Sequence, residues 1–418
     1  MSRAGIRVVV TGLGVIAGPD VGVESVGRSL TAATMRATEV DRRTGYHAHG
    51  ASQLAVLATD VDLTPWLSPA TARRMSRPSR MAVAAARMAL QDAGLAGAAG
   101  GARTGVVMST AFGAVETTEQ ILSSLRRDGP QAASPFLFAE SVANAAAGQV
   151  AIDAKAQGPN LTIVQREAGG LTAVNRATAL VTTGRCDRVL VGNVDEMPPV
   201  LHALLDRFDA LARPTDAHAE TARPFARDRN GFIAAEGATV LVIERADLAE
   251  ARGAQVRAEV LGGGSAFDPS APRIGWGRGH STLAAALRRT LDQSGVEPGE
   301  IGHVVSGASG SVAGDWLEAK LLTDVWPGDR LPPVLTPKAT LGQYGGGFLA
   351  ACILTAAGGT FGATLDIGDM DPELDVMPFG GTLSGGGLSL ATSCASGGSA
   401  AWFLLEGVGA DRRSHSGA

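Results

Sequence analysis

The residues best placed to do chemistry lie where an apolar strand gives way to a helix. A Gly-Pro turn at Gly158 precedes the apolar run 161–164, which is typical of a buried strand, and two glycines after Glu167 let the backbone bend into a helix. A side chain at such a bend lies at a helix N-terminus. There the free amide N–H groups and the helix dipole favour an anion or lower the pKa of a nucleophile. Glu167 occupies the bend, so the sequence predicts a carboxylate at this site.

Three stretches resemble the β-ketoacyl synthase family, and the resemblance covers nearly the whole chain. Residues 8–15 (VVVTGLGV) are similar to the family's first strand and turn. Residues 223–232 (RPFARDRNGF), followed by Glu236 and Gly237, are similar to a long and highly specific family motif. The run 168–171 (AGGL), after a residue that is not cysteine, resembles the ketosynthase β subunit, or chain-length factor, of type II polyketide synthases.

This resemblance implies an α/β protein with the thiolase fold. Two duplicated βαβαβαββ halves would form a five-layered α-β-α-β-α sandwich. We expect an N-terminal half over 1–250, a C-terminal half over 251–410 and a frayed tail over 411–418. A chain of 418 residues with 45% hydrophobic content is long and apolar enough to bury a large core.

The hydrophobic pattern predicts the elements that must position the motifs. Helices are expected over 22–35, 78–93, 113–125, 281–294, 314–324 and 346–357. Strands are expected over 7–16, 104–110, 161–166, 256–262, 303–307, 388–392 and 399–405, with a connecting loop at 372–378.

Three positions decide whether such a protein can form carbon–carbon bonds. A working ketosynthase uses a cysteine thiolate to accept the acyl chain and two histidines to decarboxylate the malonyl extender and stabilise the enolate or oxyanion. The resemblance places Glu167 at the cysteine position, Gly307 at the first histidine and Gln343 at the second. We therefore expect no catalytic residue, no cofactor, no metal and no independent condensation.

A carboxylate at position 167 cannot store an acyl chain, because an acyl-carboxylate anhydride would hydrolyse or transfer at once. Glu167 is expected to act as a structural plug or hydrogen-bond anchor beside Arg166. Chain-length factors usually carry glutamine at the matching position. Glutamate departs from that pattern and weakens the idea that the site mimics an acylated cysteine and promotes malonyl decarboxylation.

The resemblance also assigns a loop beside the pocket. Lys338 of the second histidine's motif is kept, and the loop 394–398 matches the family's loop before the last strand. Ser396 then replaces a gating phenylalanine, and Cys394 is the one thiol expected near the pocket. Because Cys394 lies between two strands, without a helix N-terminus to lower its thiol pKa, packing is favoured over catalysis.

In chain-length factors the helix that matches 113–125 lines a tunnel. The gate positions of that tunnel correspond to Val115, Thr118 and Leu122. All three are smaller than an aromatic residue, which predicts a roomy tunnel end if they face the cavity. Ordinary packing of the three side chains within the core is an equal alternative.

The resemblance also implies a dimer interface. It places Phe136, Phe138, Ile163, Gln165 and Arg166 there, with the strand at 161–166 pairing antiparallel with its counterpart in the other subunit. Packing of the two phenylalanines against their own sheet is an alternative.

Composition excludes several classes of partner and location. A net charge of −5 gives no reason to expect nucleic acid or an anionic membrane as partner, and no apolar run reaches the length of a membrane span. The three cysteines show neither metal spacing nor a disulfide framework, so a reduced cytoplasm is expected.

Our main hypothesis from the sequence is a chain-length factor for type II polyketide, and hence antibiotic, biosynthesis. It would form a heterodimer with a catalytic ketosynthase α subunit and shape the tunnel for a polyketide carried on the phosphopantetheine of an acyl carrier protein. A subunit that decarboxylates malonyl carrier protein for priming, with backbone N–H groups near Glu167 and Ser396 as donors, is one alternative. A homodimeric pseudoenzyme that binds an acyl ligand is another.

Overall fold

The computed structural model describes residues 5–48, 51–328, 331–362 and 369–407. The tail predicted over 411–418 lies outside these residues. The five main strands of the first half run in the spatial order β6-β5-β7-β9-β1. Their bounds are β1 Val8–Ala17, β5 Thr104–Ser109, β6 Asn160–Ile163, β7 Arg188–Asp195 and β9 Gly237–Arg245.

The five main strands of the second half repeat this arrangement as β12-β11-β15-β16-β10. Their bounds are β10 Ala258–Phe267, β11 His303–Ser306, β12 Val334–Leu335, β15 Leu388–Cys394 and β16 Ser399–Gly407. If the five strands of each half are numbered 1 to 5 along the chain, their spatial order is 3-2-4-5-1 in both halves. Each half also has the same parallel and antiparallel pairs, and a register shift of the same kind at Val10/Gly12 and at Val260/Gly262. β1 and β10 pair antiparallel, so the halves join in one sheet.

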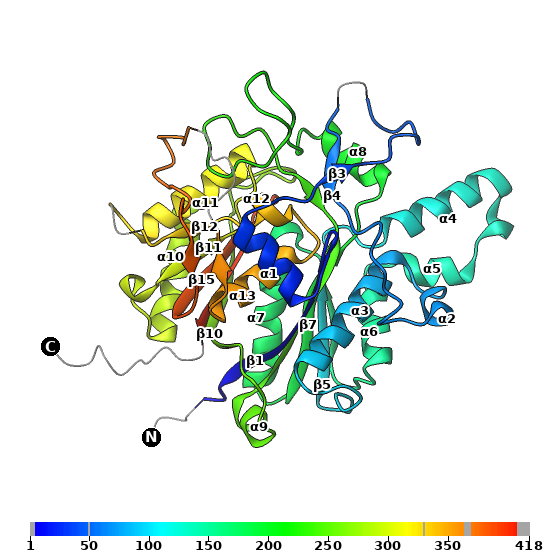
Figure 1. The fold of residues 1–418 in the computed structure, drawn as a ribbon, viewed down its shortest axis with the longest axis horizontal. Helices are drawn as coiled ribbons and strands as arrows, with labels where there is room; N and C mark the ends of the chain where they lie inside the picture. Colours follow the sequence, from blue (N-terminus) through cyan, green and yellow to red (C-terminus); the bar gives the residue numbers. More distant parts are fainter. Residues whose placement is uncertain (1–4, 49–50, 329–330, 363–368, 408–418) are drawn as a thin grey trace.

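The helices add three layers to the two halves of the sheet (Figure 1). Helices α7 (Gly169–Thr182) and α13 (Gly347–Ala356) pack between the halves around one apolar core. Helices α3 (Arg77–Asp92) and α6 (Ala145–Asp153) cover the first half's outer face, and α10 (His280–Ser294) and α11 (Val312–Val325) cover the second half's. Each half reads βαβαβαββ, which confirms the predicted thiolase fold.

Smaller elements surround this body. The remaining helices are α1 Val23–Ala32, α2 Pro69–Ala72, α4 Val115–Asp128, α5 Pro135–Ser141, α8 Pro199–Arg207, α9 Ala246–Ala251 and α12 Lys338–Leu341. The short strands are β2 Asp20–Val21, β3 Thr38–Glu39, β4 Leu54–Val56, β8 Ala234–Ala235, β13 Thr360–Phe361 and β14 Leu383–Ser384. Figure 1 shows α4 and α5 projecting together from one side of the body. No helix in the described part of the chain is both long and apolar enough to cross a membrane.

The Gly-x-Gly pair in β1 serves packing between a strand and a helix. A Cβ atom on Gly12 would lie 2.2 Å from the carbonyl oxygen of Ala89, and one on Gly14 would lie 2.0 Å from that of Ala85. Helix α3 therefore lies closer to β1 than any side chain on these residues would allow.

All the helices predicted over residues 22–357 form within a few residues of their expected bounds. Helices such as α1, α3, α4 and α10 have a periodic apolar face, whereas α13 is apolar on all sides because it is buried in the central layer. Two strand boundaries are wrong. The strand predicted to end at 166 ends at Ile163, and the strand predicted to end at 262 continues to Phe267. The small sheet β3-β4-β8 was not predicted, since two- and three-residue strands paired with distant segments leave no local pattern.

A buried carboxylate holds the first half of the sheet together. Glu244 on β9 is fully buried and accepts hydrogen bonds from Thr11, Arg188 and Arg252. Burial alone would raise the pKa of Glu244, but these hydrogen bonds outweigh it and the pKa lies below its usual value.

We predict that Glu244→Gln lowers the free energy of unfolding by roughly 3 kcal/mol at pH 7, because two arginines lose a buried partner. Since folding lowers the pKa of Glu244, the difference from the wild type should shrink as pH falls below that of a free carboxyl, about 4.5. Urea unfolding across pH measures both effects. Glu250→Gln, in an exposed pair with Arg7, is the control and should change stability by less than about 1 kcal/mol. Equal losses in the two variants would contradict the assignment.

Candidate functional site

The backbone turns sharply between β6 and α7, and the turn positions Glu167. Arg166 adopts a left-handed conformation with φ of 44°, which ends the extended run, and a 3₁₀ turn over Arg166–Ala168 leads into α7 at Gly169. The prediction that residue 167 lies at a helix N-terminus is confirmed. Gln165 and Arg166, which were predicted to belong to the strand, lie beyond the end of β6 at Ile163.

Glu167 is held mainly by the second half of the chain. Its carboxylate accepts a hydrogen bond from the Tyr344 hydroxyl at 3.3 Å and from the Ser396 backbone N–H at 3.2 Å. The Ser393 hydroxyl donates to its backbone carbonyl at 2.9 Å. Arg166 reaches over to donate to the Ser396 hydroxyl at 2.6 Å. Glu167 is therefore a hydrogen-bond anchor between the two halves.

The charge on Glu167 is disfavoured, contrary to the simplest expectation for a helix N-terminus. Burial raises the pKa of its carboxyl, while backbone N–H groups, Lys338 and Arg166 oppose the rise and do not cancel it. A helix dipole changes stability by about 0.3–1 kcal/mol, whereas burial can shift a pKa by up to about 3–5 units. Desolvation therefore decides the sign.

Gly307, at the first histidine position, has no room for a side chain. It follows β11, its N–H donates to Glu318 Oε1 at 2.8 Å, and its carbonyl accepts from Lys338 Nζ at 2.8 Å. A Cβ atom built on Gly307 would lie 2.6 Å from Oγ and 2.8 Å from Cβ of Ser393. The space that an imidazole would need is filled.

Glu318 on α11 organises the loop around Gly307, and the sequence analysis missed it. Besides the Gly307 N–H, the same oxygen accepts from the hydroxyls of Ser306 and Thr392, each at 2.7 Å. The available signal was weak, because Glu318 lies between apolar residues of α11 but the helix carries other charged residues as well. Lys338, on the other side of Gly307, is buried against the Phe348 ring, and burial lowers its pKa.

Gln343, at the second histidine position, is also buried. Its backbone pairs with Ile233 and Ala235, while its side-chain Oε1 has no hydrogen-bond partner among the described residues. It lines a cavity of about 30 Å³ together with Glu167 and Lys338. This volume is roughly that of one water molecule and far below the 300–1,000 Å³ typical of ligand sites.

Tyr344 separates this small cavity from a larger one. Its φ is 76°, and its ring packs edge-on against Phe112 and Phe232. Tyr344 and Glu167 line both the small cavity and a cavity of about 410 Å³. The pair therefore forms a wall between the two spaces. The sequence analysis missed Tyr344, because its only distinguishing feature in the sequence is that it follows Gln343.

The larger cavity has an apolar mouth. Phe208, Ile274 and Val312 line it and are all more than half exposed to solvent. Ser396 lines this cavity, as predicted for the pocket loop.

Cys394 packs in the core and lines neither cavity, which corrects its expected place beside the pocket. Side chains alternate along β15, so Ser393 faces the central layer and Cys394 faces α10 and α11. Burial raises the pKa of its thiol well above the usual value. Packing is thus the role that the structure supports.

The positions predicted for a tunnel and an interface lie on or near the projecting helices. Val115 packs against a small apolar cluster, while Thr118 and Leu122 are exposed on α4. Phe136 and Phe138 on α5 are 45% and 66% exposed. Ile163 and Gln165 are partly buried, on and just after the edge strand β6. A tunnel and an interface at these residues stay predictions.

Comparison with protein families decides the relationship. Residues 6–249 match the model of the "Beta-ketoacyl synthase, N-terminal domain" and residues 258–357 that of the "Beta-ketoacyl synthase, C-terminal domain". The chain belongs to the β-ketoacyl synthase family. The predicted division at residue 250 stays a prediction.

Two similar β-ketoacyl synthases are 3-oxoacyl-[acyl-carrier-protein] synthase 2 from Staphylococcus aureus and from Vibrio cholerae. The first is 32% identical over 89% of this chain and 91% of the relative, and the second is 30% identical over 75% and 76%. Among solved structures, the ishigamide ketosynthase/chain length factor superposes with a TM-score of 0.87 and 29% identity over 97% of this chain and 100% of that one. A β-ketoacyl synthase from Burkholderia phymatum (TM-score 0.85, 24% identity, 96% and 100% coverage) shares the fold.

We predict that Gly307→Ala lowers the free energy of unfolding by about 1–3 kcal/mol, because the added methyl group collides with Ser393. Gly299→Ala is the control, since a Cβ atom there meets nothing within 4 Å. Thermal unfolding measures both variants, and an unchanged melting temperature for Gly307→Ala would contradict the crowded geometry.

We also predict that Glu167→Gln stabilises the protein at pH 7. Folding raises the pKa of Glu167 above about 4.5, so the folded state binds an extra proton and loses stability as pH rises through that region. The neutral amide removes this penalty, keeps its one oxygen as acceptor for the Ser396 N–H, and can donate from its NH2 group to the Tyr344 hydroxyl oxygen. Melting temperatures of variant and wild type should converge near pH 4; a variant that is less stable at every pH would refute the account.

Proposed function

We propose that this chain is the chain-length factor of a type II polyketide synthase, a non-catalytic subunit that pairs with a catalytic ketosynthase. One observation carries the proposal: the fold of a condensing enzyme is complete, while the three reacting positions hold Glu167, Gly307 and Gln343. The scaffold without its reactive groups can contribute shape and binding surface, and the partner would supply the chemistry.

No thiolate is available to replace the missing cysteine. Cys186, Cys352 and Cys394 are all buried and unpaired, and burial raises the pKa of each thiol. A buried neutral thiol is a poor nucleophile. The unpaired cysteines also favour the reduced cytoplasm as the place of action.

The edge of the sheet supports pairing with a second subunit. β6 is the last strand of the sheet, so its outer backbone groups are free to pair with an antiparallel strand of a partner. Large apolar side chains are exposed on β6's flank and on α4 and α5 nearby in the chain, namely Leu122, Phe136, Phe138, Val142 and Val164. Exposed apolar groups of this kind mark protein interfaces.

The similarity to the ishigamide ketosynthase/chain length factor fits this assignment. A second structure with the same fold, at 23% identity and a TM-score of 0.85, is described as a "type II PKS acyl-carrier protein in complex with its ketosynthase bound to the hexaketide". We extend that arrangement to this chain and propose that it works with a ketosynthase and an acyl carrier protein that delivers the polyketide.

A decarboxylase that primes the pathway is the less favoured alternative. It needs a free donor for the thioester carbonyl, but the Ser396 N–H already donates to Glu167. Both histidine positions are occupied by residues that cannot act as acids. The experiment below distinguishes the proposed subunit from the other alternative, a homodimeric protein that only binds an acyl ligand.

The test is reconstitution with a ketosynthase and a carrier protein. We expect this chain alone to release no condensed product and no carbon dioxide from malonyl carrier protein, and the ketosynthase to yield polyketide only when this chain is co-purified with it. Glu167→Cys should not restore condensation to the isolated chain, because Gly307 and Gln343 still lack imidazoles. Turnover by the isolated wild-type chain would disprove the proposal.

We predict that Thr118→Trp shortens the polyketide made by the reconstituted pair. Thr118 is exposed in the single chain, so a larger side chain fits the fold and would narrow a tunnel formed against the partner. Gln120→Trp, also exposed on α4 but about 200° around the helix, is the matched control and should leave product length unchanged. Identical product lengths in the wild type and Thr118→Trp would remove Thr118 from the tunnel wall.

A further inference from the structure

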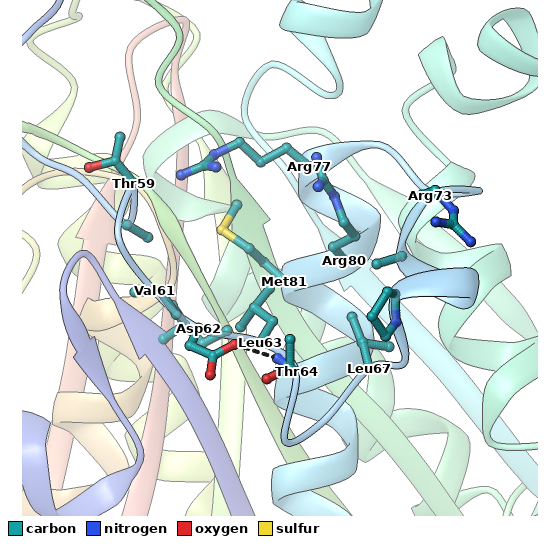
Figure 2. Close-up of a pocket in the computed structure, with 14 residues that line it drawn as sticks. Thr59, Val61, Asp62, Leu63, Thr64, Leu67, Arg73, Arg77, Arg80 and Met81 are labelled. Carbon is teal, nitrogen blue, oxygen red and sulfur yellow. Dashed lines mark hydrogen bonds between the residues drawn. The ribbon is translucent and has the colours of Figure 1, made fainter.

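A cavity of about 450 Å³ lies at the N-terminal end of α3, apart from the residues around Glu167. Figure 2 shows its lining, which comes from the loop before α2, from α2 and from the first turns of α3. We propose that this cavity binds a small organic anion, in which a phosphate or carboxylate group is attached to an aliphatic body.

Part of the cavity wall is aliphatic. Its aliphatic lining residues include Ile16, Val61, Leu63, Leu67 and Met81. No aromatic side chain is among the lining residues, so the cavity has no surface on which a nucleotide base could stack. Its volume lies in the range typical of small-molecule sites. An aliphatic group fits these walls.

Three arginines, Arg73, Arg77 and Arg80, also line the cavity, and they differ in how they are paired. Arg77 forms two hydrogen bonds with the buried carboxylate of Glu236 and is neutralised. Arg73 and Arg80 form no ion pair with any acid in the described ranges.

Arg80 gives the sharper indication of a ligand. Its Nε atom is shielded from solvent and has no hydrogen-bond partner among the residues that the structure describes. A buried donor of this kind costs free energy until an acceptor reaches it. Figure 2 shows that Arg80 and Arg77 lie on the same helix, α3. A guanidinium group binds phosphate or carboxylate with paired hydrogen bonds, which is the acceptor that this site lacks.

The acidic group in the lining does not satisfy Arg80. Asp62 is the carboxylate among the lining residues, and it accepts a hydrogen bond from the Thr64 backbone N–H at 2.9 Å. With Arg77 neutralised, two cations therefore face one carboxylate. The excess positive charge favours an anion, and the aliphatic walls favour one that carries a hydrocarbon chain.

The test is calorimetric titration of the full chain with octyl phosphate, octanoate, octanol and inorganic phosphate, each as a soluble monomer. We expect saturable binding of octyl phosphate or octanoate, at least tenfold weaker binding of inorganic phosphate and no binding of octanol. The tighter of the two anions identifies the charged group. Absence of binding by both amphiphilic anions, or equal binding of octanol, would overturn the proposal.

Variants locate the binding within the chain. Arg80→Gln should weaken binding by about tenfold or more, because a hydrogen bond to a charged group is lost. Arg73→Gln is a second test variant and should weaken binding by less than Arg80→Gln does. Its exposed position means that the substitution should leave the fold intact. Arg74→Gln is the control, since Arg74 is exposed and does not line the cavity. Affinities that are equal in Arg80→Gln, Arg73→Gln and Arg74→Gln would place the ligand elsewhere and end the proposal. The assignment as a subunit of a polyketide synthase does not depend on it.

Discussion

At Gly307, where the two halves of the chain meet, no space is left for a side chain. Ser393 occupies the volume that a side chain on Gly307 would need, and the same hydroxyl donates to the backbone of Glu167. Glu318 and Lys338 fix the Gly307 loop from either side. Because these contacts lock one another, restoring a single histidine or cysteine would not rebuild a condensing site.

The rest of the structure keeps what a condensing enzyme needs for shape. Both halves retain the 3-2-4-5-1 strand order, and α7 and α13 remain between them. The close contact of β1 with α3 through Gly12 and Gly14 is intact. The apolar cores and the open edge at β6 are present together with Glu167, Gly307 and Gln343, as expected if binding surface and cavity shape are what the protein contributes.

The sequence predicted the fold and the long helices, because hydrophobic patterns and family motifs encode them. The assignment of Glu167, Gly307 and Gln343 to the family's reacting positions stays a prediction. The sequence did not predict Glu318, Ser393 or Tyr344, whose roles arise from contacts with residues far away in the chain. Nor could it predict that burial outweighs the helix dipole at Glu167, since the depth of a side chain is set by the whole fold. The roles of Thr118 and Phe138 depend on a second subunit.

The central claim is that this polypeptide never carries the growing chain. Mass spectrometry of the intact subunits, after incubation of the reconstituted pair with acyl carrier protein bearing an acyl group, tests it directly. The account predicts an acyl adduct on the partner ketosynthase and an unmodified mass for this chain. An acyl adduct on this chain, at Glu167 or at any cysteine, would contradict it.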